Sequence, residues 1–157
     1  MEKTPYAIDF LWNQIEIGYK EIRKNRYKTL VKEFLFNPKL REKAEKLRDK
    51  KSGRNYEGGL LERTASTLSI ALCIYDNYPE IDIDLILTAI ILNLFCGVFP
   101  KKECYEKIKD YPEVVQFLFL KSRKKPSIEI TVYDSIIKLD TKIFMKLQKF
   151  RKINKER

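Results

Sequence analysis

Residues 58–97 read GGLLERTASTLSIALCIYDNYPEIDIDLILTAIILNLFCG, and this stretch decides the fold. It holds two long apolar segments without sustained alternation of apolar and polar residues, which favours helices over strands. Gly58-Gly59 opens the first segment and Tyr78-Pro79 closes it, and Asp82 or Asp84 can cap the second. The stretch therefore predicts two central helices, one from about residue 58 to 78 and one ending near residue 96.

The remainder of the chain is also predicted to be helical, since it has few glycines and clear turn signals at Asn37-Pro38 and before Pro126. The further expected helices span residues 8–23, 27–36, 40–50, 100–108, 112–123 and 130–152. We expect an all-α protein, a bundle of about seven or eight helices in a single domain over residues 1–157. Residues 1–52 would supply N-terminal helices, 53–152 the core, and 153–157 a frayed basic tail.

The charge of the chain is positive and unevenly distributed. The 157 residues carry a net charge of +10, with 44% hydrophobic and 34% charged residues. Both ends are basic, whereas residues 59–99 are slightly acidic. Such a surface favours polyanionic partners such as nucleic acid or nucleotides, and the alternative is a lysine-rich surface that only solvates the fold.

The cysteines and the apolar segments indicate a soluble, cytoplasmic protein. Cys73, Cys96 and Cys104 show no metal-binding spacing, and Cys73 and Cys96 fall in apolar runs where a free cysteine acts as a small hydrophobe. An odd number of cysteines without a signal sequence suggests a reducing compartment. The longest apolar stretch, residues 85–99, is shorter than the roughly 18 residues that a membrane span needs.

Several short motifs of the chain follow one another in a family-specific order. They are Tyr56, Gly58, Gly59, Leu60, Leu61, Glu62 and Thr64, then Tyr78-Pro79 with Asp82 and Asp84, then Ile91-Leu92, and finally Leu139-Asp140. Over about residues 30–150 this order resembles the HD-domain phosphohydrolases, in particular the HD domain of bacterial 3′–5′ exoribonucleases. The resemblance implies an all-α fold that holds one or two divalent metal ions for phosphoester hydrolysis.

The residues that would bind those metal ions are absent, because the chain contains no histidine. Arg63 stands where the family has its first metal-binding histidine, Asn93-Leu94 where it has its His-Asp pair, and Ile137 where it has its last metal-binding aspartate. Gly53-Arg54 replaces a further histidine pair. Arginine only donates hydrogen bonds, and leucine and isoleucine offer no ligand atoms. We therefore expect no metal, no cofactor and no metal-dependent hydrolysis, so that the protein is not an enzyme.

Polar residues remain at the former metal site and need partners if they are buried. Asn93 lies among apolar residues, and Asp140 falls in line with the apolar residues of the last helix. We hypothesise that Arg63 occupies the metal position and is held by Asn93 and Asp140. This cluster would be either purely structural or a cleft in which Arg63 binds phosphate.

A second group of residues is a candidate for binding anions or nucleic acid. Its members are basic or aromatic and come from the segment before the glycine motif and from the basic stretch before Pro126: Arg54, Tyr56, Lys121, Arg123, Lys124 and Lys125. Arginine and lysine would hold phosphates, and the tyrosine would stack on a base. The alternative is that these residues form a solvated loop and helix end.

These observations lead to three functional hypotheses. The first is a catalytically inactive accessory or regulatory module that binds RNA, single-stranded DNA or a nucleotide. The second is a protein docking or dimerisation module with no role in nucleic-acid binding. The third is a residual phosphodiesterase that works without metal through Glu62 and nearby lysines. No membrane partner is expected.

Overall fold

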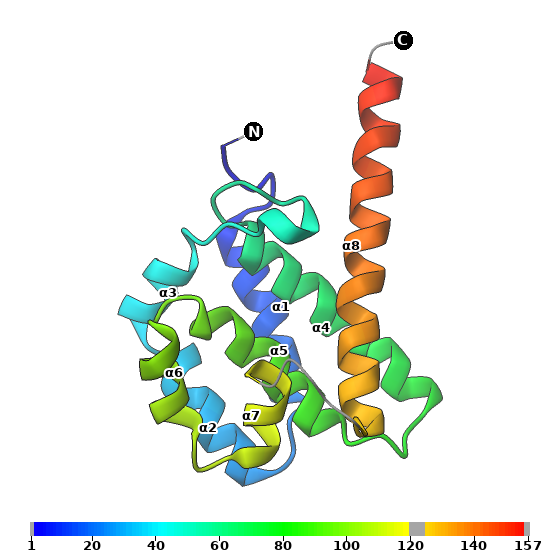
Figure 1. Cartoon of the computed structure of the whole chain (residues 1–157). Coiled ribbons are helices and arrows are strands. Elements are labelled where there is room, and N and C mark those ends of the chain that lie inside the picture. Colours follow the sequence, from blue (N-terminus) through cyan, green and yellow to red (C-terminus); the bar gives the residue numbers. More distant parts are fainter. Residues whose placement is uncertain (1, 120–124, 156–157) are drawn as a thin grey trace.

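The computed structural model describes residues 2–119 and 125–155, with side chains through Arg151 (Figure 1). These residues form eight α-helices, one 3-10 helix and no β-sheet, which confirms the all-α fold and the expected number of helices. The α-helices are α1 (Ile8–Lys20), α2 (Asn25–Leu35), α3 (Pro38–Ala44), α4 (Gly59–Asn77), α5 (Ile83–Cys96), α6 (Lys101–Ile108), α7 (Pro112–Leu118) and α8 (Ile128–Lys155); the 3-10 helix is η1 (Lys50–Ser52).

The largest departure from the expected helices lies between α3 and α4. The side chain of Asn37 accepts bonds from the N–H groups of Lys39 and Leu40 and starts α3, but the helix ends at Ala44 rather than near residue 50. The segment after Ala44 forms backbone hydrogen bonds with other parts of the chain instead. Leu60 donates its N–H to the carbonyl of Leu47, so tertiary contacts prevail here over the helical propensity of a lysine- and glutamate-rich sequence.

α5 forms the centre of the molecule. It is apolar on all sides, and Ile86, Leu87, Ile91 and Leu94 are fully buried. A helix of this kind requires neighbours all around it. α5 packs against α1, α2, α4, α7 and α8, and Asp82 caps its first turn through the N–H of Leu85.

The Gly58-Gly59 pair lets the chain pass close to the start of α4. Gly58 has a φ of +84°, a conformation that side chains disfavour. A Cβ on Gly59 would lie 2.1 Å from the carbonyl oxygen of Arg54. The two glycines therefore allow residues 49–57 to fold tightly against the N-terminus of α4, which positions Arg54 inside the protein.

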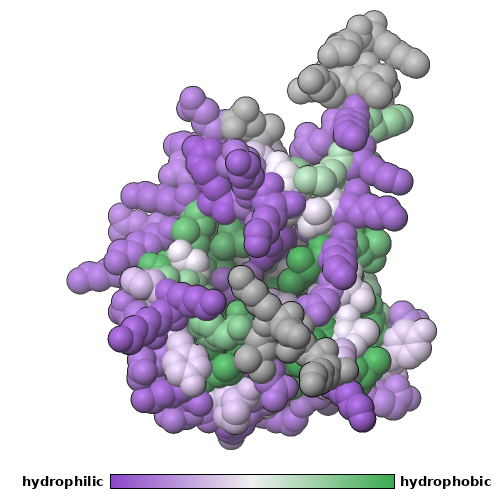
Figure 2. All heavy atoms as spheres, in the orientation of Figure 1, coloured by the Kyte–Doolittle hydropathy of each residue, from purple (hydrophilic) through white to green (hydrophobic). Residues whose placement is uncertain are grey.

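α8 is the longest helix and extends beyond the rest of the molecule in Figure 1. α4 packs against both α1 and α8, so α1 and α8 stand on either side of it. Asp140 is the last buried residue of α8, and the described side chains from residue 141 to 151 are exposed or only half-buried. The face shown in Figure 2 is mostly hydrophilic, with hydrophobic side chains visible in its middle and along α8.

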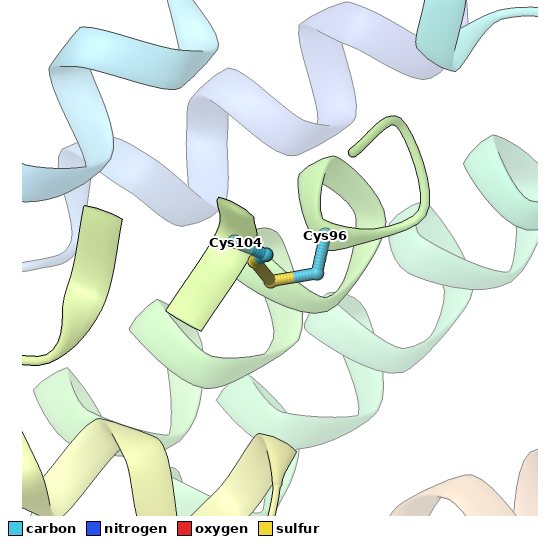
Figure 3. The surroundings of a disulfide bond; sticks show 2 residues. All are labelled: Cys96 and Cys104. Atoms are coloured by element: carbon cyan, nitrogen blue, oxygen red, sulfur yellow. A yellow bond between two sulfur atoms is a disulfide. The ribbon is translucent and has the colours of Figure 1, made fainter. Parts of the chain in front are cut away.

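Two of the three cysteines are bonded to each other, and the expectation of free cysteines is wrong for this pair. Cys96 at the end of α5 and Cys104 in α6 form a disulfide with their Cα atoms 5.5 Å apart (Figure 3). Cys73 is free but exposed rather than buried. The argument for a reducing compartment therefore loses its basis. No helix in the described part of the chain has the length and apolarity needed to cross a membrane.

The close contact at Gly59 predicts a strong effect of a single methyl group. We expect Gly59→Ala to lower the free energy of unfolding by about 1–3 kcal/mol, because its Cβ must displace the backbone of Arg54. Gly18→Ala is the matched control, since its Cβ would meet only the flexible side chain of Leu68 at 3.2 Å. Urea denaturation followed by circular dichroism measures both. Equal losses in the two variants would contradict the role given to Gly59.

Candidate functional site

The best-defined polar cluster of the protein is centred on Arg54. Its Nε donates to Oε2 of Glu62 at 2.6 Å, and its two terminal nitrogens donate to the two carboxylate oxygens of Asp140 at 2.8 and 3.2 Å. All three residues are at most 5% exposed. The guanidinium therefore joins the loop after η1 to α4 and α8, in the bidentate geometry that makes arginine–carboxylate pairs strong.

Neighbouring hydroxyl groups complete this cluster. Tyr56 and Thr4 donate to Glu62 at 2.8 and 2.7 Å, and Ser66 donates to Asp140 at 2.6 Å. The ring of Phe144 covers the guanidinium at 4.0 Å. Among the described residues no buried side-chain nitrogen or oxygen lacks a partner. The cluster is thus internally satisfied, as a buried structural network must be.

This arrangement changes the roles expected for Arg54 and Tyr56. Both were expected to contact an anion or a base. They are only 3% and 6% exposed, and their side chains donate hydrogen bonds to the carboxylates of Asp140 and Glu62. Burial opposes the charge on Arg54, yet the bonds and charges of Asp140 and Glu62 prevail and raise the pKa of the guanidinium. Glu62, held by three donor side chains, is a structural anion rather than an accessible general base.

The predicted pairing of Arg63 with Asp140 is wrong, because Arg54 takes that position. Arg63 donates instead to Asp49 at 3.1 Å, and its side chain is 11% exposed. The resemblance to HD domains assigned Arg54 to a histidine pair just as it assigned Arg63 to a single histidine, so the same reasoning applied to Arg54 could have found this pair. In the structure Arg54 bonds to Asp140 and Arg63 bonds to Asp49.

Arg63 lines an open cleft of about 390 Å³ at the end of α5. Three further cationic side chains lie along it, Arg48, Lys51 and Lys101, and all three are exposed. The walls also include Phe99, Phe119 and the disulfide-bonded cysteines. Asp49 is the single acidic residue of this lining. We name this site the Arg63 cleft; sequence reasoning missed its other cations because they come from separate segments without a shared motif.

The four residues that the sequence comparison with HD domains placed at metal positions have different environments. Arg63, Asn93 and Ile137, from α4, α5 and α8, line one small void with no room for a water molecule. Leu94 is fully buried in the core. Asn93 also lines the Arg63 cleft, although no hydrogen bond joins it to Arg63 among the described residues. Asn93 and Arg63 therefore line the same cleft without the expected hydrogen bond between them. Asp140 belongs to the Arg54 cluster instead.

The remaining candidates fall at the edge of the described structure. Lys121, Arg123 and Lys124 lie outside the described residues, and Lys125 is exposed. Within the described part of the chain, no three acidic or cysteine side chains lie close enough to hold a metal ion. The chain matches no protein-family model, no curated protein and no solved structure.

The Arg54 cluster predicts a clear pattern of stability changes. We expect Arg54→Met to lower the free energy of unfolding by about 3–5 kcal/mol, because it leaves two buried carboxylates without a counter-charge. The triple variant R54M/E62Q/D140N should recover part of this loss, since it removes the orphaned charges as well. Chemical denaturation of both variants is the measurement, and a triple variant less stable than R54M would contradict the assignment.

The burial of Tyr56 beside Glu62 predicts that the free energy of unfolding falls in alkaline solution. Burial, the hydrogen bond to Glu62 and the charge of Glu62 raise the pKa of Tyr56 above its ordinary value of about 10. The folded state then keeps a proton that the unfolded state loses, so this contribution is complete below pH about 10 and declines as the pH rises further. We expect Tyr56→Phe to show a flatter decline between pH 10 and 11 by denaturant titration. An unchanged slope would contradict this role of Tyr56.

Proposed function

We propose that the protein is a catalytically inactive HD-like module that binds phosphate-bearing ligands, single-stranded nucleic acid or a nucleotide, in the Arg63 cleft. The observation that carries this proposal is the gathering of Arg48, Lys51, Arg63 and Lys101 around one cleft with a single acidic residue. A concave site with an excess of cations concentrates anions. Phe99 and Phe119 in the same lining offer surfaces on which a base can stack.

Arg63 has the central role in this proposal because it is oriented before any ligand arrives. Asp49 bonds one end of its guanidinium, which restricts the side chain and lowers the entropy lost on binding. A guanidinium has five N–H donors, so donors remain for phosphate oxygens when Asp49 takes one. Lys51 and Lys101 are exposed and would add positive charge to the cleft without taking part in the packing of the core.

The placement of the former metal positions supports an HD-like ancestry for this site. Arg63, Asn93 and Ile137 come from three helices that are distant in sequence, yet they line one void. In this proposal Arg63 supplies the positive charge that a metal ion supplies in HD enzymes, without the activated water. The ligand would be bound and not hydrolysed, which suits an accessory or regulatory protein.

Removal of charge at the cleft tests this function. We expect K51Q/K101Q to weaken binding of a fluorescein-labelled single-stranded RNA by about tenfold at low salt and to reduce the salt slope. The matched control is K20Q/K32Q, which removes two exposed lysines that do not line the cleft. Fluorescence anisotropy at several salt concentrations measures affinity. Competition by unlabelled AMP and by inorganic phosphate separates a nucleotide site from a strand-binding site.

Two results would contradict the proposal. The first is an equal loss of affinity in the cleft variant and the control variant, which would indicate diffuse attraction to a basic surface. The second is an absence of RNA, nucleotide and phosphate binding at low salt. Circular dichroism of each variant shows whether the fold is retained.

A further inference from the structure

A second hollow of the molecule lies between α1 and α8 and has a volume of about 460 Å³. Residues of α4 line its base, together with the side chains of the Arg54 cluster. The α1 wall presents Tyr6 and Phe10, and the α8 wall presents Ile143 and Leu147. We name this hollow the α1–α8 groove; it shares no lining residue with the Arg63 cleft.

Each wall of the groove carries exposed apolar side chains, beside polar ones such as Gln14 and Gln148. Tyr6 and Phe10 are each 49% exposed, Ile143 is 47% exposed and Leu147 is 42% exposed. Single exposed apolar side chains are common on proteins, but apolar residues that face one another across a groove indicate an interaction site. The rings of Tyr6 and Phe10 stack with their centroids 6.1 Å apart, so the two side chains form one continuous apolar surface on this wall.

The dimensions of the groove fit a helix. On the first wall Tyr6 lies just before α1, and Phe10 and Gln14 lie within α1 about one helical turn apart; on the second wall the lining runs from Asp140 to Arg151 of α8. The α8 wall therefore covers about three helical turns, about 16 Å at 1.5 Å per residue. A partner helix with apolar residues at positions i, i+3 or i+4, and i+7 would fill such a trough, which is the helix-in-groove mode of recognition.

The charges along α8 specify the partner further. Residues 141–155 contain six basic residues and no acidic one. Arg151 lines the groove itself, and the two carboxylates of the lining, Glu62 and Asp140, are both paired with Arg54. A second copy of this chain carries the same net charge of +10, which opposes self-association. An acidic helix is attracted, most strongly along the edge that lies beside α8.

We propose that the α1–α8 groove binds an amphipathic, acidic helix of another protein. The groove shape argues against a membrane surface, because the apolar walls face each other across a hollow instead of lying in one plane. This interaction goes beyond ligand binding in the Arg63 cleft and uses different residues. It would connect the module to the protein that it assists or regulates.

Synthetic peptides test the proposal with the intact protein. The probe is a labelled helical peptide with leucine at i, i+3, i+4 and i+7 and glutamate on its other faces; one control peptide replaces glutamate by lysine, and another scrambles the order. We expect only the ordered acidic peptide to bind by fluorescence anisotropy, with affinity that falls as salt rises. Equal binding of the lysine peptide, or no binding of the acidic one, would overturn the proposal.

Substitutions then locate the binding surface. Ile143→Ser should weaken the acidic peptide by at least about tenfold, as loss of a central apolar anchor does. Ile128→Ser is the matched control, since Ile128 lies at the other end of α8, is 59% exposed and does not line the groove. Equal effects of the two variants would overturn the assignment of the groove. K51Q/K101Q should leave peptide binding unchanged, which separates this test from that of the Arg63 cleft.

Two further measurements exclude the other occupants. Sedimentation of the chain alone should show a monomer, and a dimer that I143S dissociates would assign the groove to a second copy. Vesicles of phosphatidylserine and phosphatidylcholine should not bind more tightly to the protein than to I143S. A loss of vesicle binding in I143S would assign the groove to a membrane and overturn the proposal.

Discussion

The guanidinium of Arg54, held between Glu62 and Asp140, is the interaction on which the rest of the structure depends. It joins the loop before α4 to α4 and to α8, through Glu62 and Asp140. A buried arginine has this capacity because its planar donors match two carboxylates at once. Its position accounts for the tight closure of the loop at Gly58-Gly59, and Asp140, its partner, is the last buried residue of α8 among the described side chains.

Much of the fold follows from the sequence, while the polar site does not. The two central helices and their caps could be predicted because the apolar runs are long and the turn signals are strong. The segment after α3 was assigned incorrectly because its helical propensity is local, whereas its final bonds go to Leu60 and Arg54. Local propensity cannot reveal partners that the tertiary fold provides.

The residue types and their spacing indicated which polar side chains would be buried, but not which of them would bond to one another. Asp140 stood out because it interrupts an apolar row, and the structure does give it a buried arginine partner. The choice between Arg54 and Arg63 depends on the tight packing of residues 49–57 against the start of α4, where Gly59 leaves no room for a Cβ, and spacing alone does not reveal it. The cations of the Arg63 cleft were missed for a similar reason, since three segments of the chain must fold before they lie together.

The way in which α8 is anchored also affects how the molecule can deform. Beyond Asp140 the helix continues for 15 residues to Lys155, a length of about 22 Å. A segment of this length amplifies any tilt at its base. A tilt of about 10° displaces the far end by about 4 Å, by the geometry of a rigid rod of that length. Because residues 143–151 form one wall of the α1–α8 groove, the width of the groove is set by the direction of α8 as well as by the core.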